Sequence, residues 1–367
     1  MTIKTPTLLL DEALCRKNIR EMTEKTAAMG LTFRPHFKTH QSHKTGRWFR
    51  EYGVDKICVS SVRMAEYFCK DGWEDILIAF PYNPMEVNEI RDLAGKTNLG
   101  LCITGPQSAE LLARDCNFKV SVMIKTDTGY GRSGSLWDNS AGLRETYRIL
   151  KQCKYISIKG LMTHSGNTYK AKSREEIQKI SELSAERLIY ARDSIGDPSL
   201  LLSVGDTPSA SVCNEFKGID ELRPGNFVFY DLMQYFIGSC RLDQVAVRVA
   251  CPVADISSDR SRVVIYGGGI HFSKEYAETE GRKVYGLLIG KNGDGRALPS
   301  EPVYLESLSQ EHGILRYSDG VPGSVSIGDL VYIIPVHSCL TAEALGGYLL
   351  GDGTRADHMQ IKYRDTL

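Results

Sequence analysis

Lys38 is the first residue of the sequence whose type and surroundings suggest chemistry. It stands in Arg-Pro-His-Phe-Lys-Thr-His (residues 34–40) and closes a strand-like run that begins at Thr32. A lysine at the end of a buried strand is costly to desolvate, and desolvation lowers its pKa. A lowered pKa is what a lysine needs to form a Schiff base with a carbonyl cofactor. The alternative is a lysine on the rim of the domain that pairs with a carboxylate.

Two later segments combine glycines with small polar side chains, and they point to a phosphate group. Such residues after a strand can bind phosphate through their backbone amides. In the strand pattern described below, the two segments follow the seventh strand and span the eighth, where β/α barrels commonly bind phosphate. We therefore favour a phosphate site over plain turns. The two segments are Ser203–Ser209 and Glu221–Asp231.

A third glycine-rich segment is Lys-Thr-Asp-Thr-Gly-Tyr-Gly-Arg-Ser-Gly (residues 125–134). Its glycines let the backbone approach a ligand, and the guanidinium of Arg132 can bind an oxygen with two hydrogen bonds. The polar segment at residues 162–169 contains His164 and Tyr169. Taken alone, the loop at residues 125–134 is weak evidence for a ligand and is better explained as a plain turn.

His337 and Cys339 form a His-x-Cys pair near the C-terminus. We expect both on a strand, where residues two apart point to the same side. Imidazole and thiolate are ligands that zinc prefers, and two protein ligands leave positions open for water and substrate, as in catalytic sites. A lone His-x-Cys arises often by chance, so the pattern by itself favours no metal.

The elements that would position these residues alternate regularly over the first two thirds of the chain. Apolar, β-branched runs are separated mostly by charged segments with helical periodicity, which indicates a parallel sheet. Eight such runs fit a closed (β/α)8 barrel of the TIM type better than an open sheet. The expected strands are Thr32–Lys38, Lys56–Val62, Asp75–Phe80, Asn98–Thr104, Ser121–Asp127, Ser157–His164, Leu200–Val204 and Glu221–Phe229.

After about Gln234 the sequence contains strand-like runs with little helical signal, which predicts an antiparallel β domain. The apolar run Thr7–Leu10 precedes the first helix and is expected to pair with this domain. We therefore predict a barrel at residues 12–235 and a β domain at residues 1–11 plus 236–367 that carries the His-x-Cys pair. The predicted strands are Gln244–Ile256, Ser261–Gly267, Tyr304–Tyr317 and Leu330–Val336, and Asn292–Arg296 is predicted as a loop.

The composition excludes several classes of partner. Lys plus Arg and Asp plus Glu both number 45, so no net charge favours nucleic acid or an anionic membrane. No apolar stretch approaches the roughly 20 residues of a membrane span, and the N-terminus lacks a signal-peptide pattern. The cysteines show no paired spacing, so we expect a reducing, cytoplasmic location.

Taken together and in order, these motifs resemble those of the D-serine dehydratase and D-threonine aldolase family, whose barrel is related to the alanine racemase N-terminal domain. The resemblance runs over nearly the whole chain. Residues 34–40 match the cofactor-lysine motif of that family, and residues 125–134 look like the racemase-type loop that faces the cofactor. Ser309–Gly313, which contains His312, and the segment around Cys339 match its metal-site segments.

The resemblance implies pyridoxal 5'-phosphate (PLP), a divalent metal, and D-3-hydroxy amino acids as substrates. Lys38 would then carry PLP as a Schiff base, Arg132 would lie near its phenolic oxygen, and Tyr169 would be a partner of its pyridine nitrogen. His337 and Cys339 would bind the metal, zinc before manganese. The implied phosphate contacts are Gly205, Thr207, Gly225 and Asn226.

Within this family the segments at residues 164–169 and 203–208 look like the dehydratase versions, and the aldolase-type phosphate loop is absent. We therefore predict dehydration of a D-3-hydroxy amino acid to a keto acid and ammonia, with Lys38 taking the Cα proton. The alternative is retro-aldol cleavage with His164 or His312 as the base. An amino-acid racemase, a non-catalytic PLP carrier and a barrel without cofactor also remain open. The related enzymes imply a homodimer.

Overall fold

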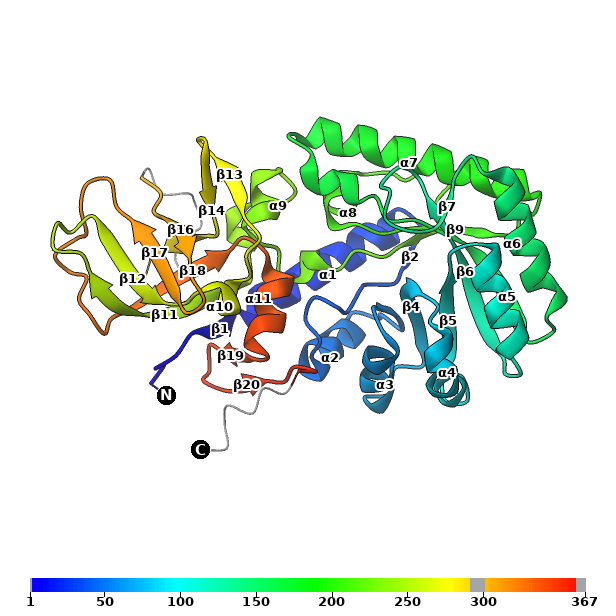
Figure 1. Cartoon of the computed structure of the whole chain (residues 1–367), viewed down its shortest axis with the longest axis horizontal. Coiled ribbons are helices and arrows are strands. Elements are labelled where there is room, and N and C mark those ends of the chain that lie inside the picture. The colour runs from blue at the N-terminus through cyan, green and yellow to red at the C-terminus, as the bar shows by residue number, and fades with distance from the viewer. Residues whose placement is uncertain (1, 291–300, 361–367) are drawn as a thin grey trace. The chain divides into compact units, whose positions relative to one another are not determined.

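The computed structural model describes residues 2–290 and 301–360 (Figure 1). Contacts divide the chain into two compact units, and each is described by itself. The barrel unit comprises residues 20–38 and 49–225, and the β unit comprises residues 1–19, 39–48 and 226–367. The chain leaves the barrel unit directly after Lys38 and returns to it at Phe49.

The barrel unit contains the eight parallel strands that the sequence predicts. They follow one another in the order β2-β10-β9-β8-β6-β5-β4-β3. A parallel bridge between His36 and Cys58 closes the ring, because Phe37 N–H donates to the Cys58 carbonyl at 2.8 Å and Cys58 N–H donates to the Pro35 carbonyl at 2.9 Å. The strands are β2 (Thr32–Phe33), β3 (Lys56–Val59), β4 (Asp75–Pro81), β5 (Asn98–Ile103), β6 (Val120–Asp127), β8 (Ile156–Met162), β9 (Leu201–Val204) and β10 (Glu221–Leu222).

Helices lie outside these strands and connect them (Figure 1). The interior of the barrel holds a buried apolar cluster that includes Cys58, Cys102 and Met123. A short strand, β7 (Ser135–Leu136), pairs with β6 beside the barrel. The connecting helices are α3 (Val62–Lys70), α4 (Val87–Ala94), α5 (Pro106–Asp115), α6 (Ser140–Gln152), α7 (Arg174–Ile195) and α8 (Thr207–Val212). The prediction of a β/α barrel is confirmed.

The β unit contains a second sheet, in the order β12-β17-β16-β15-β18-β11-β1-β19-β20. Strand β1 (Thr7–Leu10) pairs antiparallel with β11 and parallel with β19, which confirms that the N-terminal run belongs to this sheet. The other strands are β11 (Val247–Ile256), β12 (Arg262–Tyr266), β15 (Gly286–Ile289), β16 (Tyr304–Leu308), β17 (His312–Arg316), β18 (Leu330–Pro335), β19 (Tyr348–Leu350) and β20 (Arg355–Ala356).

The structure corrects two predictions in the β unit. The run Tyr304–Tyr317 is a hairpin of two strands, because Ser309 N–H donates to the His312 carbonyl at 2.9 Å and turns the chain. The strand that begins at Leu330 ends at Pro335, and a helix follows. The predicted loop Asn292–Arg296 lies outside the described residues.

Short elements that the sequence pattern did not show lie mainly at the turns between strands. A helix of one or two turns has too few apolar repeats to produce a periodic signal. These elements are α2 (His43–Glu51), α9 (Leu232–Phe236), α10 (Gly269–Phe272), α11 (Ser338–Leu345), and the hairpin strands β13 (Ala277–Thr279) and β14 (Arg282–Val284). The first helix is α1 (Glu12–Ala28).

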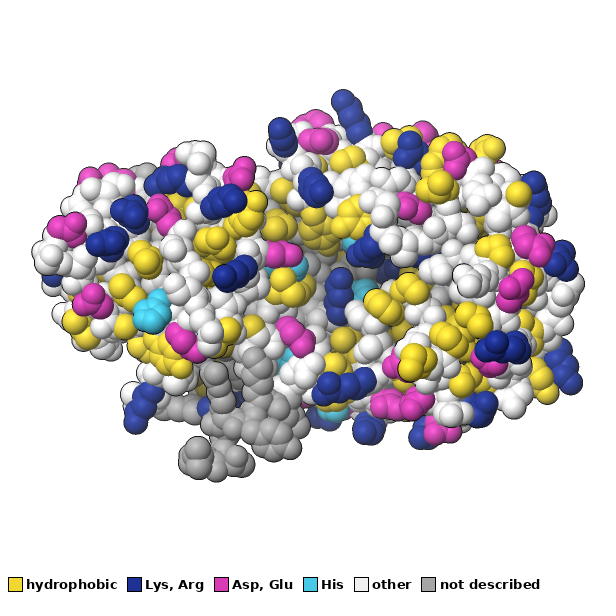
Figure 2. Space-filling view, viewed as in Figure 1, with side chains coloured by type: hydrophobic (Ala, Val, Ile, Leu, Met, Phe, Trp, Pro, Cys, Tyr) yellow, Lys and Arg dark blue, Asp and Glu magenta, His cyan; other side chains and the backbone are white. Residues whose placement is uncertain are grey.

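Positive and negative side chains are interspersed on the face of the molecule that Figure 2 shows. All ten cysteines are free thiols. In the described parts of the chain, no helix is long and apolar enough to cross a membrane.

A buried ion-pair network in the barrel unit supports the first prediction, which concerns stability. Arg34 follows β2, and its guanidinium lies 2.5 Å from Asp75 and 2.8 Å from Glu221. We expect Arg34→Ala to lower the free energy of unfolding by about 3–5 kcal/mol, because it removes the nearer cation from the buried carboxylate of Glu221. The control is Arg148→Ala, which breaks an exposed pair with Glu145. Urea unfolding of both variants checks this, and equal midpoints would contradict it.

Candidate active site

Lys38 lies at the mouth of the barrel unit, two residues beyond the bridge that closes the ring. Its backbone N–H donates to His36 Nδ1 at 3.3 Å. Its side chain is exposed, so the prediction of a lysine desolvated at the end of a buried strand is wrong. Strand β2 ends at Phe33, and the following residues rise to the rim before Lys38 is reached. An exposed amine at this position is accessible to a cofactor.

Lys125 is the buried lysine of the barrel, and sequence reasoning assigned it no role. It belongs to β6, and only 7% of its surface is exposed. Within the described residues its ammonium has no hydrogen-bond or ion-pair partner. Burial, together with the nearby cations Arg223 and Arg132, lowers the pKa of Lys125 to about 8. The burial of Lys125 could have been predicted from the sequence. Residues two apart on a strand point to the same side, and Met123 lies in the barrel interior.

Lys125 gives a prediction about stability and pH. The folded-state pKa of about 8 lies below the ordinary value of 10.5, so the folded protein binds fewer protons than the unfolded chain between these values. The penalty for burying the ammonium is therefore complete below pH 8, and stability rises as the pH passes from 8 to 10.5. We expect Lys125→Met to raise the free energy of unfolding at pH 7 by about 1–3 kcal/mol.

Urea unfolding of both proteins at pH 7 and pH 10 measures this effect. The stability advantage of Lys125→Met over the wild type should be large at pH 7 and small at pH 10. An advantage that is the same at both pH values would contradict burial of an unpaired ammonium at Lys125.

Two histidines near Lys38 are held in their neutral form. Burial lowers the pKa of His36 well below its ordinary value, and Lys38 and Arg223 add to the effect. The pKa of His164 is lowered in the same way by burial, then by Arg132 and Lys38. The His164 Nδ1–H donates to the Gly205 carbonyl, which leaves Nε2 as the acceptor of the ring. His164 therefore presents an unprotonated Nε2, and the lowered pKa makes this nitrogen a weaker base than that of an ordinary histidine.

The loop that carries Arg132 is organised by Asp127. One carboxylate oxygen of Asp127 accepts hydrogen bonds from the backbone N–H groups of Gly129, Tyr130 and Gly131 at 2.9–3.1 Å. Gly129 and Gly131 have φ values of 117° and 77°, which glycine adopts at little cost. The exposed guanidinium of Arg132 lies 5.4 Å from the centre of the Tyr130 ring. The loop thus presents a cation at the end of β6.

The predicted phosphate-binding residues Gly205 and Thr207 follow β9. A Cβ atom added at Gly205 would lie 3.0 Å from Arg223 Cβ and 3.1 Å from the Arg223 carbonyl, so close packing requires glycine there. The Thr207 N–H donates to the Tyr169 hydroxyl at 3.4 Å, which places Tyr169 beside this loop. Asp206 is the N-cap of α8 and accepts the Ser209 N–H at 2.7 Å. A backbone-lined turn of this kind suits a phosphate group.

Arg223 is a second residue that sequence reasoning did not single out. It is 4% exposed and follows β10. Its guanidinium donates to the Ser203 hydroxyl and to the Thr163 carbonyl, both at 2.6 Å. Together with Lys38, Lys125 and Arg132 it gives the mouth of the barrel a positive charge. Such a site favours a ligand with several anionic groups.

Gly225 and Asn226, the other predicted phosphate contacts, fall on either side of the boundary between the two units. The side-chain amide of Asn226 donates to Asp231 at 2.8 Å, to the Ser338 hydroxyl at 2.9 Å and to the sulfur of Cys339 at 3.4 Å. The side chain of Asn226 thus serves the β unit. A contact from this residue to phosphate would have to use its backbone.

His337 and Cys339 flank the start of a helix and do not share a strand, which corrects the geometric argument made from sequence. His337 is the N-cap of α11, and Cys339 stands in its first turn. His337 Nδ1 lies 3.2 Å from Glu275 Oε2, which fixes the ring and leaves Nε2 available for a metal. A helix N-terminus favours the thiolate form of a cysteine. The donor set therefore still fits a zinc-type ion.

Cys339 also contacts the residue that follows Lys38 in the chain. Its thiol donates to the Thr39 hydroxyl at 3.3 Å, and Thr39 is fully buried. His312 begins β17 with an exposed side chain, and no hydrogen bond or ion pair among the described residues links it to His337 or Cys339. No group of three or more His, Cys, Asp or Glu side chains that could hold a metal occurs in residues 2–290 and 301–360. Within the described residues, the pair would therefore supply only two protein ligands to a metal.

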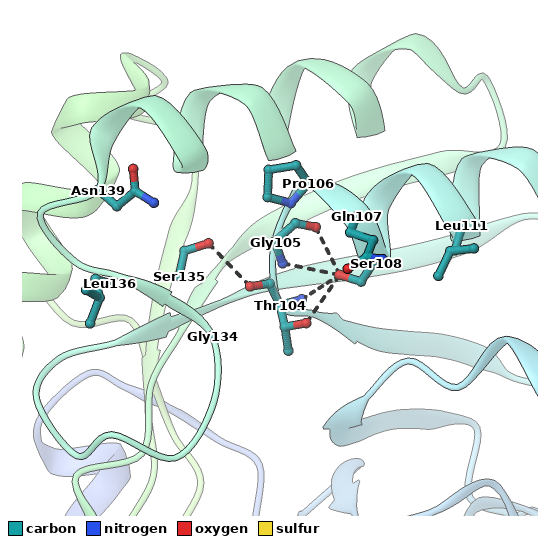
Figure 3. Close-up of a pocket in the computed structure, with 10 residues that line it drawn as sticks. All are labelled: Thr104, Gly105, Pro106, Gln107, Ser108, Leu111, Gly134, Ser135, Leu136 and Asn139. Carbon is teal, nitrogen blue, oxygen red and sulfur yellow. Dashed lines mark hydrogen bonds between the residues drawn. The ribbon is translucent and has the colours of Figure 1, made fainter.

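A separate pocket of about 490 Å³ lies at the end of β5 and the start of α5 (Figure 3). It is lined by backbone and small polar side chains, among them Thr104, Ser108 and Ser135. Hydrogen bonds from Ser108 and Ser135 to residues 104 and 105 hold its wall together (Figure 3). None of the predicted site residues lines this pocket, and we assign it no role.

The fold and the barrel mouth define a class of protein. The family model of the alanine racemase N-terminal domain matches residues 10–232, and the chain belongs to this PLP-dependent family. A second model, the putative serine dehydratase domain, matches residues 246–350, which contain His337 and Cys339.

Relatives over the whole chain narrow this class. The chain is 28% identical over 368 residues to D-threo-3-hydroxyaspartate dehydratase of Delftia sp. (strain HT23), with 96% of each chain covered. A solved structure of that dehydratase superimposes with a TM-score of 0.89 over 97% of this chain and 98% of the other. The chain is also 28% identical to D-serine dehydratase of Dictyostelium discoideum, over 94% of this chain and 93% of the other. These relatives place the chain among the PLP-dependent lyases.

Proposed function

We propose that the protein is a PLP- and divalent-metal-dependent lyase that dehydrates a D-3-hydroxy amino acid, D-serine or D-threonine, to a 2-keto acid and ammonia. The observation that carries the proposal is that the candidate cofactor lysine is followed in the chain by a residue that contacts a candidate metal ligand. Lys38 is exposed at the barrel mouth, and the next residue, Thr39, is hydrogen-bonded to Cys339. The relatives named for dehydratase activity support the reaction class.

The residues at the barrel mouth fit PLP. Lys38 offers an accessible amine for covalent attachment, and the turn at Gly205 and Thr207 offers backbone amides for the phosphate. The cations Arg132 and Arg223 supply charge for the other anionic groups. When bound, PLP supplies an electron sink that stabilises negative charge at the substrate Cα.

The residues of this chain then have separable roles. Lys38 would hold the cofactor, and its amine would also be placed to take the Cα proton of the substrate. Arg132 can bind the phenolic oxygen or a carboxylate with its two-pronged donor set. His36 and His164 remain neutral, so they add no charge to a site already rich in cations. Tyr169 supports the phosphate turn through Thr207.

His337 and Cys339 would hold the metal, and we propose zinc, with manganese as the alternative. A metal at this position supplies a Lewis acid for the 3-hydroxyl, since hydroxide is a poor leaving group. Glu275 orients His337, and Asn226 donates to the sulfur of Cys339, so both ligands have supporting contacts. A cysteine-to-alanine variant of the Delftia dehydratase is described as being in a metal-free form.

Retro-aldol cleavage is the second candidate. The observation that favours it is the neutral imidazole of His164, whose Nε2 could take a proton from a substrate hydroxyl. D-threonine aldolase of Arthrobacter sp. is 22% identical over 99% of this chain. His312 is exposed, and within the described residues no hydrogen bond or ion pair links it to His337 or Cys339.

Incubation with D-threonine separates the two reactions by product. The proposed dehydratase gives 2-oxobutanoate and ammonia, whereas an aldolase gives glycine and acetaldehyde. Glycine and acetaldehyde without 2-oxobutanoate would replace the proposal by the aldolase. We also propose a cytoplasmic homodimer with no nucleic-acid or membrane partner, which sedimentation analysis of the PLP-loaded protein can test.

A further inference from the structure

The segment that follows Lys38 leads directly into helix α2. Residues 39–42 connect Lys38 to α2, which begins at His43, and they belong to the β unit together with the first part of that helix. The four N–H groups at the start of a helix lack partners within the helix, so something else must bind them. The acceptors at this helix show what holds the segment.

A carboxylate from the far end of the chain binds the start of α2. Asp357 accepts the His43 N–H at 2.9 Å, the Lys44 N–H at 3.0 Å and the Ser42 hydroxyl at 3.1 Å. Ser42 in turn accepts the Thr45 N–H at 3.1 Å. One carboxylate, more than 300 residues away in sequence, thus completes the cap of this helix. A negative charge at a helix N-terminus is also favourable electrostatically.

Further contacts from the same end of the chain fix the residues between Lys38 and the helix. Gln41 has a φ of 44°, a conformation that a residue with a Cβ adopts only when its surroundings enforce it. Its amide donates to Glu343 at 2.6 Å, and its carbonyl accepts the Met359 N–H at 2.7 Å. The Tyr348 hydroxyl donates to the His40 carbonyl at 2.6 Å. The path of the chain after Lys38 is therefore set by residues 343–359.

We propose that Asp357 is a positioning residue for Lys38, acting through the cap of α2 and the segment 39–42. The inference rests on the proposed function, in which Lys38 holds PLP and moves the Cα proton. Asp357 touches neither of these groups. Removal of its carboxylate leaves three donors without their acceptor and releases one end of the strained segment, so the amine of Lys38 samples more positions.

The test compares Asp357→Ala with Ser173→Ala in the full-length protein. Ser173 caps the N-terminus of α7 by accepting the Glu176 N–H at 3.2 Å. Ser173→Ala therefore also removes a helix cap, but from a helix of the barrel unit that does not follow Lys38. PLP-loaded proteins are reduced with borohydride, and the label on Lys38 is measured by mass spectrometry. Steady-state kinetics give kcat and KM, and amide hydrogen exchange of the cofactor-free protein covers residues 39–46.

We expect Asp357→Ala to lower kcat by about tenfold, with KM nearly unchanged. The amount of label formed on Lys38 at limiting PLP should also fall by about tenfold. Exchange at residues 39–46 should be faster, and added formate should restore part of kcat by binding at the vacated helix terminus. Asp357→Asn keeps an acceptor and should lie between the wild type and Asp357→Ala. Ser173→Ala should leave the label and kcat unchanged.

Equal labelling and equal kcat in Asp357→Ala and Ser173→Ala would overturn the positioning role. If Asp357→Ala fails to fold, Asp357→Asn carries the same comparison, and wild-type values for that variant would overturn the role equally. A wild-type protein that is not labelled at Lys38 would overturn the proposed function instead. In that case unchanged exchange at residues 39–46 in the variants would also show that Asp357 does not hold the segment.

Discussion

Lys38→Ala is expected to abolish turnover and covalent attachment of PLP together. Lys38 is the exposed amine at the barrel mouth, and the proposed function gives it both the bond to the cofactor and the Cα proton. Loss of a proton-transfer group alone costs about 10²–10⁴-fold, so we expect kcat to fall by at least about 10³-fold. The absorbance band of the lysine-bound cofactor should be missing from the variant.

The matched control is Lys70→Ala, which removes an exposed lysine from the last turn of α3. This variant should keep the absorbance band and wild-type kinetics. Retention of the band and of turnover in Lys38→Ala would contradict the role of Lys38. Among the described residues, Lys125 is the lysine that the barrel buries, so a band that persisted in Lys38→Ala until Lys125 was also replaced would transfer the role to that residue.

Cys339→Ala is expected to remove the metal while leaving PLP bound. Cys339 and His337 are the two candidate ligands, and loss of a supporting contact alone typically costs 10–100-fold in metal affinity, so we expect loss of a ligand to cost at least about 100-fold. Dehydration should fall with metal content, because the 3-hydroxyl loses its Lewis acid. Elemental analysis after dialysis, with kcat measured on the same sample, tests both effects.

Cys69→Ala provides the control, since Cys69 is also a half-buried free thiol and lies on α3 in the barrel unit. It should bind one metal ion per chain and turn over at the wild-type rate. Full activity in metal-free Cys339→Ala would show that the His-x-Cys pair has no part in the reaction. The PLP absorbance band should be the same in both variants, which separates metal loss from unfolding.

The barrel could be predicted from the sequence because its signal is repeated. Each apolar run, such as Asp75–Phe80, is one of eight, and the alternation with helices leaves few other architectures. The β unit was harder to predict from the sequence, because hairpins and short helices interrupt its apolar runs. The helix α11 is an example, since the apolar strand before it gives a stronger signal than the eight residues Ser-Cys-Leu-Thr-Ala-Glu-Ala-Leu.

Residues of the candidate site could be predicted from the sequence only where the residue type itself was informative. Lys38, His337 and Cys339 were predicted from the sequence because their motifs, taken together, resemble those of a known family. The supporting groups could not be found this way. Glu275 reaches His337 across 62 residues and Asp357 reaches Ser42 across 315, and such contacts exist only after folding. The burial of Lys125 and the exposure of Lys38 likewise depend on where each strand ends.

The most direct test of the central claim is product analysis with D-serine. Protein loaded with PLP and zinc is incubated with D-serine, and pyruvate, ammonia, glycine and L-serine are quantified before and after the metal is removed with a chelator. We expect equal amounts of pyruvate and ammonia, loss of both after chelation, and their return when zinc is added. Glycine and formaldehyde, L-serine alone, or pyruvate formation that survives complete removal of metal would contradict it.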